Sequence, residues 1–291
     1  MVRALILCVS FLACARAGVV VGVLGDHKPD GWSKGSGCTS GADLDLIECN
    51  LRVYNTTAAE AKAQGVQLLL FPEAYALAPS LSETSFSEPL LGALGAVPCT
   101  AANASASSPQ QAALSCIALR NALPLAANVF TTLPNGTRHI TELVYDGRGA
   151  LLALYHKHHL FPTETKSVSA GPFAPTTFEL LGRTWGIIIC YEGVYPVVTG
   201  DYAQMDALKR MGASAFIWSI GSDAPMATIS KSWGKKYQTA VSAAIDGNLL
   251  DGTGAIVAPG GTEVAYTDTV LASLSAVGYT AKAKLRVGSL P

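Results

Sequence analysis

Apolar and polar positions along the chain follow two periods, which together predict alternating helices and strands. Apolar residues recur every three or four positions, as in an amphipathic helix, at Leu44, Ile47, Leu51, Tyr54, Ala58 and Ala61. Gly65 is expected to end this helix. The run 66–71 that follows is short and continuously apolar, which is typical of a buried strand. The run 18–24 near the N-terminus has the same character.

Three further strands, joined by two turns, are predicted in the middle of the chain. They cover residues 128–133, 140–145 and 150–155. The pairs Asn135-Gly136 and Asp146-Gly147 separate them, and such pairs favour tight hairpin turns. Before these strands, residues 99–111 are rich in Ala, Ser, Asn and Gln and are expected to form a surface excursion.

The C-terminal half continues the alternation of strands and helices. Strands are expected at 184–190 and 213–220, and helices at 201–211, ending at Gly212, and at 228–245. The last fifty residues are predicted to form hairpins, with one turn at Gly260-Gly261. Strands that alternate with helices, mixed with hairpins, predict an α/β layered fold with a mixed sheet.

The first 17 residues have the layout of a secretory signal peptide. Arg3 gives a positive start, residues 4–15 are apolar, and Ala15-Arg16-Ala17 resembles a small-residue cleavage site. We therefore expect a signal peptide at 1–17, a single domain at 18–291 and a secreted or secretory-pathway location.

The cysteines are consistent with an oxidising compartment. Five of the seven lie outside the expected signal peptide: Cys38, Cys49, Cys99, Cys116 and Cys190. The first four form two short-range pairs in plausible disulfide positions, although sequence alone does not fix the connectivity. Cys190 is then left over. Sequons for N-glycosylation at Asn55, Asn103 and Asn135 fit the same compartment.

Composition excludes several classes of protein. Of the 291 residues, 49% are hydrophobic and only 14% are charged, which excludes intrinsic disorder. Lys and Arg total 20 against 21 Asp and Glu, with no basic stripe, so nucleic acid is not an expected partner. Apart from the N-terminus, no apolar run approaches the roughly 20 residues that a membrane span needs.

Three residues with reactive side chains stand where predicted strands end. Glu73 follows Leu68-Leu69-Leu70-Phe71-Pro72, Lys157 follows the third hairpin strand, and Cys190 ends the run Ile187-Ile188-Ile189. Rigid scaffolds present catalytic groups on the loops that follow strands. The sequence therefore suggests that the three side chains share one site.

The segments LLLFPEAYAL, YDGRGALLALYHKHHLFPTE and WGIIICYEGVYP carry a resemblance to a known family. The chain resembles the nitrilase, or carbon–nitrogen hydrolase, superfamily, and is most similar to its vanin/biotinidase branch of secreted amidases. The resemblance implies a four-layer αββα sandwich and a catalytic triad of Glu73, Lys157 and Cys190. It also implies that Glu164 is a second glutamate that supports the lysine and the base.

The expected chemistry follows from the residue types. A thiol with a pKa of about 8.5 carries little thiolate at neutral pH, so Cys190 needs a base, and a buried Glu73 suits this role. Cys190 would attack a carbonyl carbon and form a thioester, which water then hydrolyses. The Lys157 ammonium and the backbone N–H of Tyr191 are the candidate donors to the oxyanion. No cofactor is expected.

Other polar and aromatic residues near these segments have less defined roles. Glu192 is expected to anchor the turn after the nucleophile, and Trp218 is either core or a substrate-binding wall of the pocket. His156, His158 and His159 could suggest a metal, but no Asp, Glu or Cys completes a ligand set nearby. No metal site is therefore predicted.

The sequence excludes one alternative function, a papain-like protease, and leaves several others open. A papain-like protease needs a histidine after its cysteine, and all five histidines precede Cys190. A nitrilase or an N-acyltransferase would use the same triad, and a secreted binding module could keep the fold without catalysis. The leading hypothesis is a secreted amidase for a small linear amide. The resemblance makes this substrate pantetheine-like or biocytin-like, and it leaves open whether a homodimer forms.

Overall fold

The computed structural model describes residues 18–25, 43–78, 84–221, 226–245, 254–271 and 283–291. The expected signal peptide and Cys38 lie outside these residues. The described strands belong to one mixed sheet, whose main path runs β6-β5-β4-β2-β1-β10-β9-β8-β7.

The middle of this path joins segments that are far apart in the sequence. β1 (Val19–Gly25) pairs in parallel with β2 (Leu68–Leu70) on one edge. On its other edge β1 meets β10 (Ala240–Ile245) in parallel and β13 (Lys284–Leu290) in antiparallel pairing. β1, β2 and β10 are almost wholly buried, as their continuous apolar runs require.

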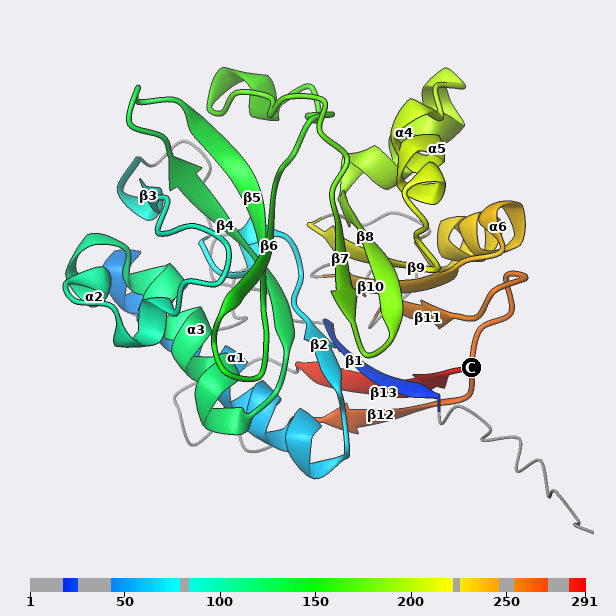
Figure 1. The fold of residues 1–291 in the computed structure, drawn as a ribbon, viewed down its shortest axis with the longest axis horizontal. Helices are drawn as coiled ribbons and strands as arrows, with labels where there is room; N and C mark the ends of the chain where they lie inside the picture. Colours follow the sequence, from blue (N-terminus) through cyan, green and yellow to red (C-terminus); the bar gives the residue numbers. More distant parts are fainter. Residues whose placement is uncertain (1–17, 26–42, 79–83, 222–225, 246–253, 272–282) are drawn as a thin grey trace, which may run out of the picture.

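The two ends of the path form the two halves of a sandwich. One half is an antiparallel meander of β4 (Leu125–Thr132), β5 (Arg138–Tyr145) and β6 (Leu151–His156). The other contains β7 (Thr177–Leu180), β8 (Arg183–Ile189) and β9 (Ala215–Ile220). β6 and β7, the two ends of the path, contact each other, so the sheet folds over into a nearly closed shape (Figure 1).

Helices cover both outer faces of this sandwich (Figure 1). One group consists of α1 (Asp43–Ala63), α2 (Ala104–Ser107) and α3 (Pro109–Asn121). The other consists of α4 (Tyr191–Thr199), α5 (Ala203–Arg210) and α6 (Met226–Tyr237). The predicted α/β fold with helices outside a two-layered sheet is confirmed. None of the helices in the described ranges combines the length and apolar character of a membrane span.

Shorter elements complete the described chain. They are β3 (Glu88–Pro89), β11 (Ala255–Val257), β12 (Tyr266–Val270) and four 3-10 turns at Ala74–Ala76, Thr84–Phe86, Pro98–Thr100 and Glu164–Lys166. β12 pairs with β13 and β11 with β10, both antiparallel, as the predicted C-terminal hairpins require.

Most predicted turns are present where the sequence placed them. Gly136 has a positive φ of 82°, and the N–H of Leu133 donates to the carbonyl of Thr137 across this turn. At the next turn the residue with positive φ is Gly149 rather than Gly147, and Asp146 Oδ1 accepts the N–H groups of Arg148 and Ala150. Glycine at such positions avoids the strain of a side chain.

The prediction of one helix over 228–245 was wrong in its second half. The helix ends at Tyr237, and Gln238 has a positive φ of 49°. Residues 240–245 form β10 instead, paired with β9 along its whole length and buried at every position. The alanine-rich sequence is compatible with a helix, but pairing with β9 and burial determine the strand.

The prediction of a surface excursion over residues 99–111 was only partly correct, and helix α3 was not predicted. Ser108, Gln110 and Gln111 are buried although they are polar. Gln110 and Gln111 donate their backbone N–H groups to Glu88 of β3, which caps the start of α3. These polar side chains are buried because they make specific hydrogen bonds. The helix therefore lacks the regular apolar spacing from which a helix is predicted. α4, which directly follows Cys190, was also missed.

Candidate active site

Glu73, Lys157 and Cys190 come from three different strand ends and meet in one buried cluster. Glu73 follows β2, Lys157 directly follows β6, and Cys190 directly follows β8. Lys157 Nζ lies 2.7 Å from Glu73 Oε1, and the Cys190 thiol lies close enough to both groups to influence their pKa values. Glu73 and Lys157 are fully buried, and Cys190 is 7% exposed. Cys190 is also a free thiol.

Cys190 sits on a sharp turn between β8 and α4. Its φ of 42° is unusual for a residue with a side chain and indicates backbone strain of the kind found at functional sites. Its N–H donates to the carbonyl of Ser219 at 2.7 Å, which ties the turn to the end of β9. Tyr191 is the first residue of α4, so its N–H has no acceptor within the helix and is suited to bind an oxyanion.

The side chain of Trp218 supports this turn through a hydrogen bond. Its indole N–H donates to the carbonyl of Cys190 at 2.9 Å, and the side chain is fully buried. A Cβ added to Gly193 would lie 2.3 Å from the Trp218 ring, so the helix after the nucleophile packs directly on the indole. Core and pocket wall were the two roles considered for Trp218. Its full burial corresponds to the core, where it supports the turn at Cys190.

Glu164 holds the other side of the lysine. Lys157 Nζ donates to Glu164 Oε1 at 2.8 Å, so the ammonium lies between two carboxylates. The second oxygen of Glu164 accepts the N–H of Phe161 at 2.7 Å. Glu164 is therefore fixed by its own loop and in turn orients Lys157.

Glu192 links the loop after Lys157 to the turn at Cys190. Its Oε2 accepts the N–H of Ile189 at 2.9 Å, one residue before Cys190. Its Oε1 accepts the Tyr155 hydroxyl at 2.6 Å and the N–H groups of His158 and His159 at 2.8 and 3.2 Å. One carboxyl group thus fastens the segments on both sides of the site.

Burial and charge set the protonation of the cluster. Burial raises the pKa of Glu73 to about 7, and the Lys157 charge offsets part of this rise. Burial alone would lower the pKa of Lys157, but the charges of Glu73 and Glu164 outweigh it and raise that pKa. Burial, with the Glu73 charge, holds the pKa of Cys190 well above its usual range. The resting site therefore contains a thiol next to a basic carboxylate.

The three neighbouring histidines bind different partners. His156 Nδ1 contacts Thr141 Oγ1, His158 Nδ1 contacts the Gly171 carbonyl, and His159 Nδ1 contacts Gln204 Oε1. Within the described ranges, no three His, Cys, Asp or Glu side chains gather as metal ligands. His158 and His159 hold the loop that follows Lys157, and His156 links β6 to β5.

Two polar residues near the site, Asn128 and Glu142, were not predicted from the sequence. They face each other across β4 and β5, and Asn128 Nδ2 donates to Glu142 Oε2 at 2.9 Å. Both are fully buried. The available signal was a polar residue inside each of two apolar strands of a predicted hairpin, at positions that pair directly.

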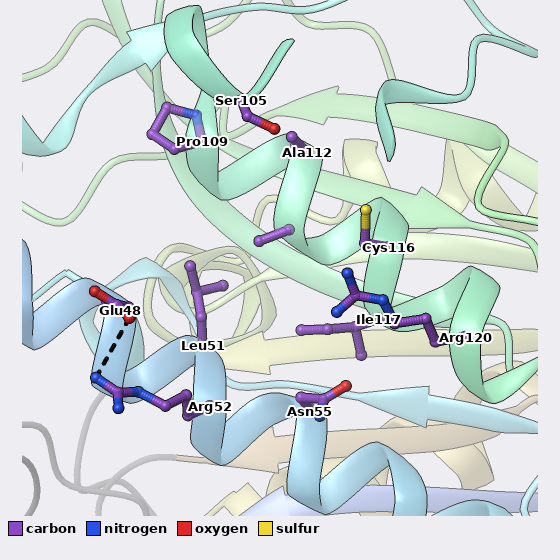
Figure 2. Close-up of a pocket in the computed structure, with 11 residues that line it drawn as sticks. Glu48, Leu51, Arg52, Asn55, Ser105, Pro109, Ala112, Cys116, Ile117 and Arg120 are labelled. Atoms are coloured by element: carbon purple, nitrogen blue, oxygen red, sulfur yellow. Dashed lines mark ion pairs between the residues drawn. The ribbon is translucent and has the colours of Figure 1, made fainter. Parts of the chain in front are cut away.

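A separate groove of about 350 Å³ lies between α1 and α3 (Figure 2). Its lining includes Leu51, Ile117 and the exposed ion pair of Glu48 with Arg52, and the sequon residue Asn55 stands at its edge. Glu73, Lys157 and Cys190 do not line this groove.

The fold and a family-model match define the class of protein. The structure resembles that of an amidase from Nesterenkonia sp., a nitrilase-superfamily member, with a TM-score of 0.68, 19% identity, and coverage of 96% of this chain and 93% of that one. This similarity shows the fold. The carbon-nitrogen hydrolase family model matches residues 46–226, and the chain belongs to this family.

Relatives of known name lie in one branch of the family. Human pantetheine hydrolase VNN2 is 30% identical over 166 residues, which cover 51% of this chain and 31% of the relative. Biotinidase from Takifugu rubripes is 27% identical over 186 residues, covering 53% and 37%. The alignments thus span between about a third and two fifths of these curated relatives. The expected similarity to the vanin/biotinidase branch is confirmed.

Proposed function

We propose that this protein hydrolyses a linear amide, R–CO–NH–R′, to an acid and an amine through a thioester on Cys190. The observation that carries the proposal is the buried cluster of the Cys190 thiol, the Glu73 carboxyl and the Lys157 ammonium. A free thiol, a base of raised pKa and a fixed cation are the groups that acyl transfer to sulfur needs. Membership of the carbon-nitrogen hydrolase family supports the same reaction class.

The reaction divides into two halves in which Glu73 moves the protons. Glu73 takes the thiol proton while Sγ of Cys190 attacks the carbonyl carbon. Lys157 and the N–H of Tyr191 stabilise the oxyanion. Glu73 then gives its proton to the departing amine, the C–N bond breaks, and a thioester remains. In the second half Glu73 takes a proton from water, the hydroxide attacks the thioester, and the proton returns to the Cys190 sulfur as the acid leaves.

The supporting residues keep this geometry through their contacts. Glu164 fixes the Lys157 ammonium through a 2.8 Å hydrogen bond, so the cation does not have to reorient during the reaction. Glu192 and Trp218 hold the backbone before and at Cys190. We assign these three residues positioning roles, because each acts through a catalytic residue.

The proposed substrate is pantetheine-like or biocytin-like. Pantetheine would give pantothenate and cysteamine, and biocytin would give biotin and lysine. The names of the relatives, pantetheine hydrolase and biotinidase, support this choice. Loops over 75–98 and 162–176 are expected to determine which amide fits, and residues 79–83 of the first loop lie outside the described residues.

A substrate panel tests the proposed function. Purified protein would be incubated with pantetheine, biocytin, simple aliphatic amides and nitriles, with Cys190→Ala as the control. We expect turnover of at least one amide and none by the alanine variant. Turnover of nitriles alone would favour the nitrilase alternative. Unchanged turnover by Cys190→Ala would contradict the mechanism.

Thiol labelling distinguishes an enzyme from a binding module that keeps the same fold. If Glu73 acts as the base, iodoacetamide should alkylate Cys190 rapidly, and Glu73→Gln should slow that reaction. An unreactive thiol in the intact protein would favour the binding module.

We also propose that the chain is secreted and glycosylated. The Cys99–Cys116 disulfide supports an oxidising compartment, and Cys49 is disulfide-bonded as well. The sequon residues Asn55, Asn103 and Asn135 are all exposed, so each can carry a glycan without disturbing the core. Expression through a secretory pathway, followed by enzymatic deglycosylation and mass spectrometry, would test this. An intact leader and unmodified sequons in the released protein would contradict it.

A further inference from the structure

Glu142 is a buried carboxyl group that the proposed reaction does not use. It lies in the middle of β5, between Asn128 on β4 and Tyr155 on β6. Glu142 Oε2 accepts a hydrogen bond from Asn128 Nδ2 at 2.9 Å, and Asn128 Oδ1 accepts the N–H of Ala74 at 3.2 Å. Because Ala74 directly follows Glu73, this chain of contacts reaches the turn that carries the general base.

Glu142 is also near the opposite half of the sandwich. The hydroxyl of Ser219 on β9 lies close enough to the Glu142 carboxyl to influence its pKa. The backbone carbonyl of the same serine accepts the N–H of Cys190 at 2.7 Å. Glu142 therefore stands between the element that holds the base and the element that holds the nucleophile.

We propose that Glu142 is a positioning residue held as the neutral acid, whose hydroxyl donates to Ser219 while its carbonyl oxygen accepts from Asn128. In this form it connects the two halves of the sheet beneath Glu73 and Cys190. The inference rests on the proposed function in that it assigns Glu142 a role in holding those two groups at reaction distance.

The surroundings of Glu142 favour the neutral acid. Glu142 Oε1 and Ser219 Oγ are both buried, and neither has a hydrogen-bond partner among the described residues. A proton on Oε1 pairs these two atoms with each other, whereas a carboxylate would be left with few donors. The charges of Glu73 and Glu192 also disfavour a further negative charge, and burial, the larger effect, raises the pKa of Glu142 to about 8.

Two substitutions at Glu142 separate the neutral acid from a carboxylate. In Glu142→Gln, the amide oxygen can accept from Asn128 and the amide NH₂ can donate to Ser219, so the hydrogen bonds of the neutral acid are retained. Glu142→Ala removes both. The readouts are the rate of Cys190 alkylation by iodoacetamide across pH, and kcat and KM for the amide substrate.

We expect Glu142→Ala to slow alkylation and lower kcat by about tenfold, with little change in KM, because the base and nucleophile lose alignment. Glu142→Gln should recover most of that loss and keep the pH profile of the native protein. Ser219→Ala should give an intermediate loss. Glu179→Ala, an exposed glutamate on β7, is the matched surface control and should leave both rates unchanged.

Two results would overturn the inference. If Glu142→Gln loses as much as Glu142→Ala, an ionised carboxylate is required. If Glu142→Ala keeps the native rates, no positioning role exists. Should Glu142→Ala fail to fold, the comparison of Glu142→Gln with the native protein still decides between acid and carboxylate. Absence of amide turnover by the native protein would count against the proposed function instead, because the alkylation measurement needs no amide substrate.

Discussion

At the scale of single residues, the proposed reaction depends on how burial changes the carboxyl group of Glu73. A glutamate in water is ionised well below neutral pH, and as a weak base it would take little part in thiol activation. Full burial raises the pKa of Glu73, while Lys157 at 2.7 Å keeps the ionised form accessible. The pKa of Glu73 therefore lies close to neutral pH, where a general base is most effective.

This protonation predicts how activity depends on pH. Glu73 must be ionised to accept the thiol proton, and its pKa lies at about 7. The value of kcat/KM should therefore fall about tenfold per pH unit well below pH 7 and level off above it. Steady-state rates across pH would measure this limb. A profile for the native enzyme that is flat through this range would show that a different group acts as the base.

Glu192 leads to a prediction about stability. Glu192→Ala removes the acceptor of four hydrogen bonds, from Tyr155, His158, His159 and Ile189. Leaving these partly buried donors unpaired should lower the free energy of unfolding by about 3 kcal/mol, and activity should fall because Cys190 adjoins the loosened turn. Urea denaturation would measure the first effect.

Tyr155→Phe is the matched control for Glu192→Ala. It removes one of the four donors, together with the acceptor of Gln204 Nε2, and leaves the carboxyl group in place, so it should cost about 1–2 kcal/mol. Equal losses in the two variants would mean that the backbone contacts of Glu192 contribute little.

At the scale of elements, short turns and caps place the reactive side chains. α4 begins directly after Cys190 because Cys190 adopts a positive φ and Gly193 lets the helix pack against Trp218. In the same way, α3 begins where Glu88 of β3 accepts the N–H groups of Gln110 and Gln111. In both cases a contact from another strand fixes where the helix starts.

The Glu88 cap predicts the stability of α3. Glu88→Ala would leave two backbone N–H groups in the first turn of α3 without their acceptor, and the Gln111 side-chain amide would lose one of its two acceptors. We expect a loss of about 2 kcal/mol in the free energy of unfolding, measured by urea denaturation. As a control, Glu48→Ala removes an exposed ion pair with Arg52 and should change stability by less than about 0.5 kcal/mol. Similar losses in both variants would argue against the cap.

At the scale of the whole molecule, the sheet brings distant segments to one site. β2, β6 and β8 are separated by long stretches of sequence, yet their ends converge because the strand path folds over until β6 meets β7. β13 returns to pair with β1, so the last and first described strands stabilise each other. The site therefore depends on closure of the sandwich.

The disulfide gives a prediction at this scale. Cys99 and Cys116 are 17 residues apart, and a bridge of this loop length stabilises a protein by about 3 kcal/mol. The double variant Cys99→Ser, Cys116→Ser should lose about this much in urea denaturation. Cys190 alkylation should be unchanged in the folded variant, because the bridge lies outside the buried cluster. A changed alkylation rate would mean that the bridge also shapes the active site.

The sequence by itself determined the features that depend on residues close together along the chain. The apolar runs ending at Phe71 and Ile189 mark buried strands, and α1 follows its own three- and four-residue period. The chain order of Glu73, Lys157 and Cys190 at strand ends pointed to one site, and the structure brings the three together.

Only the tertiary structure decided what depends on partners distant in the sequence. Residues 240–245 form a strand because β9 lies beside them, against their helical composition. Glu142 meets Ser219 only when the two halves of the sheet face each other. The pKa of Glu73 rises because the folded chain removes water from around it and places Lys157 and Glu164 nearby. Burial and long-range pairing are properties of the closed sandwich, so a local pattern of residues cannot specify them.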